Sequence, residues 1–182
     1  TDCYYPDLRR DEVYAWVQSE VARIIETYGL RWVKVDCNHD CHTDPSGTEF
    51  AVYYDRWYRL LDEWHARFPQ VVFEGCSSGG LRHDWADVAH YHTHFLSDTV
   101  DPIDVLRISF GTLLRMSPVR INRWPVLTAI GPAVTTASER PGEETEKVLA
   151  PTYCTWERAA TYSLDFAVRV AMPGSFGLSG NL

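Results

Sequence analysis

The fold prediction for this sequence starts from the stretch Leu30-Arg-Trp-Val-Lys-Val-Asp36. Its short run of apolar and β-branched residues is typical of a strand, which ends at Asp36. Residues 11–28 precede it and carry apolar side chains at helical spacing, with Gly29 placed to end the helix. A polar loop follows the strand, and a second helix is expected over residues 50–68, closed by Pro69. This order of elements indicates a βα unit.

The same order recurs about five times along the chain. Further strands are expected at residues 71–73, 93–96, 126–130 and 175–178, and further helices at 85–89, 103–114 and 155–172. Such alternation is typical of a parallel sheet, either open and doubly wound or closed into a (β/α)8 barrel. No Gly-x-Gly-x-x-Gly follows a strand, and polar residues gather just after strand ends, as on the catalytic face of a barrel. The predicted fold class is α/β, a partial TIM barrel of about five βα units, roughly its second half.

Composition excludes several classes of partner. The chain has 182 residues and a formal net charge of −8, so no basic face is available to neutralise a nucleic acid backbone. No apolar run approaches the length of a membrane span, and we expect neither a membrane partner nor a signal peptide. The five cysteines form no regular framework, which favours a reducing compartment and a cytoplasmic location.

The first strand carries a candidate catalytic group. Trp32, Lys34 and Asp36 alternate along the strand and therefore share one face. Lys34 sets a cation beside the carboxylate of Asp36 and favours its ionised form, as a nucleophile requires. The competing interpretation is an aspartate that caps the next loop, with Lys34 as its ion-pair partner.

Two later strands are each followed by residues suited to the same chemistry. The small residues 75–80 let a ligand approach the backbone closely, although an ordinary glycine turn has the same composition. Asp98 follows the strand at 93–96, and two carboxylates on neighbouring loops of a barrel face are what glycoside hydrolysis requires. Asp101 precedes Pro102 and the next helix, so it is expected to be an N-cap.

Together these motifs resemble glycoside hydrolase family 36, the melibiase-type α-galactosidases. The resemblance covers residues 8–111 in order and spacing, and the remainder resembles the closing strands of that barrel more loosely. The matching runs are Lys34-Val-Asp36-Cys-Asn38, Phe73-Glu-Gly-Cys-Ser-Ser-Gly-Gly-Leu-Arg-His-Asp84, Ser97-Asp-Thr-Val-Asp101 and Arg107-Ile-Ser-Phe-Gly111.

The resemblance implies a retaining double displacement on terminal α-galactosides such as melibiose and raffinose. Asp36 matches the nucleophile and Asp98 the general acid/base. The resemblance also implies that the protein needs no cofactor and no metal. It implies an oligosaccharide or glycoside as the partner and a full-length protein able to form a homo-oligomer. The residues expected to bind the sugar are Lys34, Asn38, Cys76, Gly79, Arg82 and Asp101.

The sequence also departs from the family pattern. Other residues than the family's usual ones stand at six positions, which affects the choice of sugar and aglycone: Val35, Cys37, His39, Phe95, Thr99 and Val100. Residues 1–182 are interpreted as the C-terminal part of the catalytic barrel domain, without the flanking β-rich domains and the first barrel strands. Since such a barrel is incomplete, we expect the isolated segment to be inactive or nearly so.

Four alternatives remain open at this stage. An α-N-acetylgalactosaminidase or a galactosyl transferase of the same family would use the same intermediate. A non-catalytic carbohydrate-binding barrel would keep the pocket and lose turnover. A metal-binding barrel would use the ligand-type side chains of residues 37–42 or the alternating His90, His92 and His94, but neither set has a standard zinc spacing.

The charged residues within 120–151 are interpreted as a solvated loop without a function.

Overall fold

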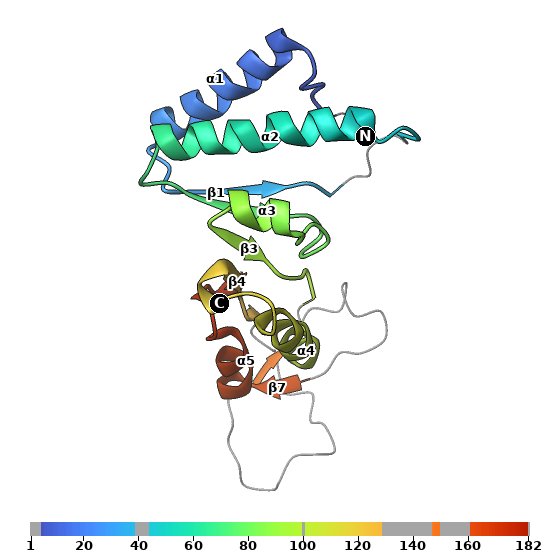
Figure 1. Ribbon diagram of the computed structural model, residues 1–182. Helices are drawn as coiled ribbons and strands as arrows, with labels where there is room; N and C mark the ends of the chain where they lie inside the picture. Colours follow the sequence, from blue (N-terminus) through green and yellow to red (C-terminus); the bar gives the residue numbers. More distant parts are fainter. Residues whose placement is uncertain (1–4, 39–43, 100, 129–146, 150–160, 182) are drawn as a thin grey trace, which may run out of the picture. The chain divides into compact units, whose positions relative to one another are not determined.

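We describe the fold from a computed structural model (Figure 1), which places residues 5–38, 44–99, 101–128, 147–149 and 161–181. The chain divides into two compact units, Thr1–Thr93 and His94–Leu182, and each is described by itself. The boundary falls within the strand β3 (Thr93–Phe95). No helix within the described part of the chain is both long and apolar enough to cross a membrane.

The first unit alternates helices with parallel strands. It contains α1 (Asp11–Tyr28), β1 (Trp32–Asp36), α2 (Thr48–Arg67), β2 (Val72–Cys76) and α3 (Trp85–His90). In Figure 1 the two long helices, α1 and α2, lie together on one side of β1. The strands β1 and β2 pair in parallel, as two strands joined by the crossover helix α2 should.

An apolar cluster holds the first unit together. Phe73 of β2 is completely buried and stacks on Trp64 of α2 at 6.1 Å between ring centroids. Leu60 and Leu61 of α2 and Ile25 of α1 are buried in the same cluster. The valines of β1 point toward the helices and pack against this cluster. The side of the sheet that faces the helices is therefore apolar. The opposite side of β1 and β2 is left for the polar residues of the motifs.

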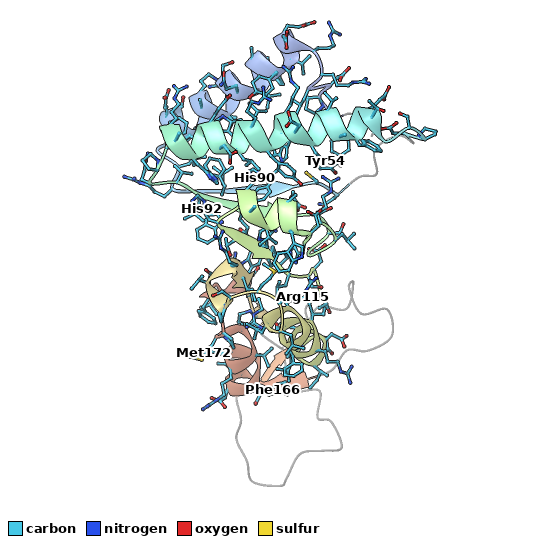
Figure 2. The ribbon with its side chains drawn as sticks, in the orientation of Figure 1. Tyr54, His90, His92, Arg115, Phe166 and Met172 are labelled. Atoms are coloured by element: carbon cyan, nitrogen blue, oxygen red, sulfur yellow. The ribbon has the colours of Figure 1, made fainter. Side chains whose placement is uncertain are left out.

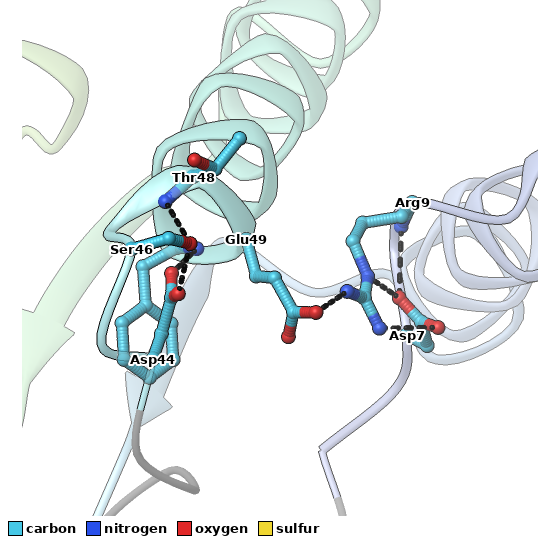
Figure 3. Close-up of polar contacts among 7 residues, drawn as sticks. Asp7, Arg9, Asp44, Ser46, Thr48 and Glu49 are labelled. Atoms are coloured by element: carbon cyan, nitrogen blue, oxygen red, sulfur yellow. Dashed lines mark hydrogen bonds and ion pairs between the residues drawn. The ribbon is translucent and has the colours of Figure 1, made fainter.

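Polar contacts fix the start of α2 (Figure 3). The carboxylate of Asp44 accepts hydrogen bonds from the Ser46 hydroxyl at 2.8 Å and from the backbone N–H of Phe50 at 2.9 Å. Arg9, which also pairs with Asp7, reaches Glu49 in the first turn of α2 at 2.8 Å. These charges are at least partly exposed, so they locate the helix start more than they stabilise the fold.

The second unit continues the parallel pattern and adds short strand pairs. Its elements are α4 (Pro102–Leu113), η1 (Pro118–Arg120), β4 (Ile121–Arg123), β5 (Val126–Thr128), β6 (Lys147–Leu149), β7 (Thr161–Ser163), α5 (Leu164–Ala171), β8 (Ser175–Phe176) and β9 (Ser179–Asn181). His94 and Phe95 of β3 pair in parallel with β4, and β4 pairs in parallel with β8. β5 pairs in parallel with β9, whereas β6 and β7 are antiparallel.

The predicted elements of the first unit are confirmed to within a few residues, with one correction. The backbone of Gly29 is left-handed (φ 60°, ψ 38°), as predicted for the end of α1. The strand β2 continues to Cys76, although residues 75 and 76 were expected to belong to a loop. Small residues gave this part of the strand the composition of a turn. The pairing with β1 nevertheless continues to its last residue.

The predictions for the second unit need more correction. β4 was not predicted, because Ile121 is the only apolar residue of its three. The helix expected over 155–172 begins only at Leu164, after β7, and residues 155–160 lie outside the described part of the chain. The strand expected over 126–130 is described as Val126–Thr128. The last predicted strand is divided into β8 and β9, with Gly177 between them.

Two glycine-to-alanine changes should shift stability in opposite directions. Gly29→Ala places a side chain on a left-handed residue and should lower the free energy of unfolding by about 1 kcal/mol. Gly111 lies inside α4 with open space around its Cα, so Gly111→Ala should raise that free energy by about 0.5–1 kcal/mol. Chemical denaturation of the full-length protein measures both. A stabilising Gly29→Ala would contradict the left-handed cap.

Candidate active site

The motif residues of the first unit share one face of the β1–β2 pair. Trp32, Lys34 and Asp36 alternate along β1, as expected. The parallel register sets Lys34 directly opposite Glu74 and Asp36 directly opposite Cys76. Five side chains with polar atoms therefore occupy the face that the helices do not cover. Asp36 is exposed at the carboxyl end of its strand, where a barrel enzyme places catalytic groups.

The thiol of Cys76 is hydrogen-bonded to the carboxylate of Asp36. Burial raises the pKa of this thiol to about 12; the hydrogen bond to Asp36 also raises it, against a backbone hydrogen bond from Gly79 that lowers it. The thiol is only 6% exposed. Cys76 therefore stays protonated at neutral pH and can act as a donor to the carboxylate of Asp36, the predicted nucleophile.

The loops that follow β1 and β2 are joined by hydrogen bonds. The hydroxyl of Ser77 donates to the carbonyl of Cys37 at 2.6 Å. The side-chain oxygen of Asn38 accepts from the backbone N–H of Ser78 at 2.7 Å. Ser78 (φ 42°) and Gly79 (φ 80°) both have positive φ, which strains a residue with a side chain. Asn38 thus holds the strained loop.

Arg82 extends this loop toward α2. Its guanidinium carbon lies 5.8 Å from the ring centroid of Tyr54, within the range of a cation–π contact. The Arg82 side chain also forms a hydrogen bond with the side chain of Tyr5. Tyr54 lies near the amino-terminal end of α2 (Figure 2). These contacts anchor the loop to the helix layer.

Sequence reasoning missed Glu74. Its side chain is 1% exposed and accepts a hydrogen bond from the indole nitrogen of Trp32 at 2.7 Å. The signal was available in principle, because Glu74 is two residues before Cys76 in an apolar strand and must share its face. It was obscured by the assignment of the residues after Phe73 to a loop.

The remaining predicted residues lie in the second unit, beyond the end of β3. Asp98 is exposed, and the neighbouring Ser97 hydroxyl accepts the backbone N–H of Thr99 at 3.1 Å. Asp101 is 8% exposed and accepts the backbone N–H groups of Ile103 at 2.8 Å and Asp104 at 3.2 Å. Asp101 is therefore the N-cap of α4, as predicted.

The histidines proposed as an alternating metal set have other surroundings. His90 ends α3 rather than lying in a strand, and its Nδ1 is 2.8 Å from a carboxylate oxygen of Asp62. His92 precedes β3, and its Nδ1 accepts the backbone N–H of Phe73 at 3.0 Å. His94 is the one of the three within β3. The alternation on a strand was therefore wrong for His90 and His92; both rings appear with their neighbours in Figure 2.

Among the described residues no group of three or more histidine, cysteine or carboxylate side chains is arranged to hold a metal ion. Residues 39–42, which belong to the other candidate metal set, lie outside the part of the chain that the structure describes. Cys37 and Cys76, the two cysteines within it, are free thiols.

Comparison with known proteins identifies relatives of this chain. The Melibiase family model matches residues 3–130. α-Galactosidase C of Emericella nidulans is 32% identical over 174 residues, which is 94% of this chain and 20% of that protein. α-Galactosidase 2 of Hypocrea jecorina is 30% identical over 168 residues, 91% of this chain and 19% of that protein. The chain therefore spans about a fifth of the length of the curated relatives it matches.

Solved structures of the same family share the fold. α-Galactosidase AgaB of Geobacillus stearothermophilus matches with a TM-score of 0.71 and 25% identity, over 97% of this chain and 22% of that one. A variant of α-galactosidase AgaA from the same organism, in complex with raffinose, matches with a TM-score of 0.73 and 23% identity, over the same shares. These matches confirm the predicted α/β fold, part of a TIM barrel.

The stability of the first unit should depend on pH through His65. Burial lowers the pKa of His65, and so does the neighbouring His92, whose ring centroid is 4.4 Å away. Below the ordinary histidine pKa of about 6.5, the unfolded chain therefore binds more protons than the folded chain. The free energy of unfolding should fall as the pH falls through that value. His65→Phe should weaken this dependence, as measured by thermal unfolding between about pH 7.5 and 5. An equally steep loss in the variant would contradict this account.

The Cys76 thiol should resist alkylation. Because Cys76 is buried and protonated whereas Cys37 is half-buried, iodoacetamide at pH 8 should modify Cys37 at least about tenfold faster. Asp36→Asn removes a negative charge that raises the thiol pKa and should therefore accelerate modification of Cys76. Peptide mapping by mass spectrometry measures each site separately. An unchanged rate at Cys76 in Asp36→Asn would argue against the contact between the two side chains.

Proposed function

Because this chain belongs to the melibiase family, we propose that it forms part of the catalytic barrel of an enzyme that hydrolyses terminal α-D-galactosides. The observation that carries the proposal is the pairing of Asp36 with Cys76 at the carboxyl ends of two parallel strands, inside the region that the family model matches. The relatives that cover most of the chain are named α-galactosidases, which supports this activity.

The proposed reaction is a retaining double displacement. In the first step the carboxylate of Asp36 attacks the anomeric carbon, and Asp98 gives its proton to the leaving glycosidic oxygen. In the second step Asp98 takes a proton from water, which attacks the same carbon and releases Asp36. Asp36 is the last residue of β1 and Asp98 comes after β3, so each aspartate lies at the carboxyl end of its own strand, as catalytic groups of barrel enzymes do.

Two neighbours of Asp36 in the first unit support its proposed role as the nucleophile. Lys34 lies two residues before Asp36 on the same face of β1 and brings a cation to that face. The protonated thiol of Cys76 donates a hydrogen bond that orients the carboxylate. In this proposal Lys34, Cys76 and Gly79 also contact the galactose ring, and Asn38 and Arg82 hold the loop that carries Gly79.

Small oligosaccharides with a terminal α-galactose are the proposed substrates. The support comes from relatives, since structures of α-galactosidase AgaA variants contain raffinose in one case and stachyose in another. The free thiols of Cys37 and Cys76 support a reducing compartment, such as the cytoplasm, as the proposed location.

Substitution of the two aspartates in the full-length protein tests the proposal. Asp36→Asn should lower kcat by at least about 10⁴-fold on every α-galactoside, because both steps need the nucleophile. Asp98→Asn should slow melibiose or raffinose hydrolysis far more than hydrolysis of a nitrophenyl α-galactoside, since nitrophenolate leaves without a proton. The matched control is Asp104→Asn, an exposed carboxylate of α4 that pairs with Arg107.

The stereochemistry of the first product supplies the second readout. Proton NMR during early turnover should detect α-galactose before mutarotation, because two inversions at the anomeric carbon restore its configuration. β-Galactose as the first product, or full activity of Asp36→Asn, would refute the proposed mechanism.

A further inference from the structure

Glu74 is a buried carboxylate that the proposed reaction does not use. It lies at the centre of β2 with only 1% of its surface exposed. A carboxylate removed from water is costly unless a cation or several donors compensate its charge. The surroundings of Glu74 should therefore contain a compensating group whose position the carboxylate controls.

One partner of this carboxylate is neutral. The indole nitrogen of Trp32 donates to Oε2 of Glu74 at 2.7 Å, a short and well-formed hydrogen bond. The indole carries no net charge, so it orients the carboxylate without balancing it. The cation must come from elsewhere on the same face.

The parallel register supplies that cation. Lys34 is the residue of β1 directly opposite Glu74, and neighbouring strands are about 4.8 Å apart. Asp36 is two residues further along the same face of β1, about 6.6 Å away. The four-carbon side chain of Lys34 can therefore bring its ammonium group between the two carboxylates. The order Trp32, Glu74, Lys34, Asp36 and Cys76 then alternates donors with negative groups across the face.

We propose that Glu74 is a positioning residue that holds the ammonium group of Lys34 beside Asp36 and toward the sugar. The inference rests on the function proposed above, since Lys34 has a role there only if a galactoside binds on this face. Two properties of Glu74 suit it for positioning. Its burial restricts the carboxylate to one place, and the hydrogen bond from Trp32 restricts its orientation. Asp36, by contrast, is exposed at the end of its strand.

A double-mutant cycle in the full-length protein separates positioning from a merely structural role. Glu74→Gln keeps the shape and an acceptor for the indole but removes the charge. It should lower kcat/KM for a nitrophenyl α-galactoside by about 10- to 100-fold, but by less than about threefold when Lys34→Met is already present. An equal loss in both backgrounds would overturn the proposal, because Glu74 would then act independently of Lys34.

Glu63→Gln is the matched control. Glu63 is a half-buried carboxylate of α2 that accepts a hydrogen bond from the Tyr14 hydroxyl at 2.9 Å. The same change of carboxylate to amide there should leave kcat/KM within about twofold of the wild type, because Glu63 has no part in the polar face.

Thermal unfolding of the same variants reports on the ion pair without relying on activity. Lys34→Met leaves the buried charge of Glu74 unbalanced, and Glu74→Gln leaves the half-buried charge of Lys34 unbalanced. Each single change should therefore lower Tm, whereas the double variant should recover part of that loss. If the wild type does not hydrolyse α-galactosides, the proposed function fails, and with it the role of Glu74 in that reaction. The Tm values still decide whether Lys34 and Glu74 are paired. Additive Tm losses would show that they are not.

Discussion

The in-register parallel pairing of β1 with β2 is the constraint on which the proposed chemistry depends. It sets Asp36 opposite Cys76 and Lys34 opposite Glu74. Because side chains alternate between the faces of a strand, a slip of one residue would turn the polar residues of β2 toward the helices. The apolar cluster resists that slip, since Phe73 fills the opposite face against Trp64. The hydrogen bonds of Ser77 and Ser78 to the loop after β1 hold the same register at the strand ends.

This pairing places buried side chains of β2 opposite residues of β1 that have a role in the proposed reaction. Cys76 and Glu74 are buried and restricted, and each is paired across the strands with a residue of the proposed reaction, Asp36 and Lys34 respectively. Asp36 is at the exposed strand end, where a ligand can reach it. A buried residue that orients a reactive neighbour costs little reorganisation when the substrate binds. In the proposed reaction, these buried neighbours keep the carboxylate of Asp36 in place before the substrate binds.

The sequence predicted the parts of the molecule in which local signals agree. The helix that ends at Gly29 has both apolar periodicity and a residue that tolerates positive φ, and the structure confirms it. Asp101 was predicted as an N-cap because Pro102 follows it, which the structure also confirms. The family was identified because several weak motifs occur in the right order, although none is specific alone.

Other features depend on partners that are distant in sequence. β4 contains only one apolar residue, and it forms a strand because β3 and β8 pair with its two edges. The cross-strand position of Glu74 could not be predicted while β2 was expected to stop at Phe73. The surroundings of His92 depend on a backbone N–H group 19 residues earlier, which no local pattern indicates.

The most direct test of the central claim, that Asp36 is the nucleophile, is to trap the covalent intermediate. A fluorinated galactosyl fluoride forms a glycosyl-enzyme faster than water can remove it, because fluorine destabilises the positively charged transition state of each step and fluoride is a good leaving group. After digestion of the full-length protein, mass spectrometry should find the peptide that contains Asp36 heavier by one fluorogalactosyl group, attached to that aspartate. A label on another carboxylate, or turnover without any labelled peptide, would contradict the account.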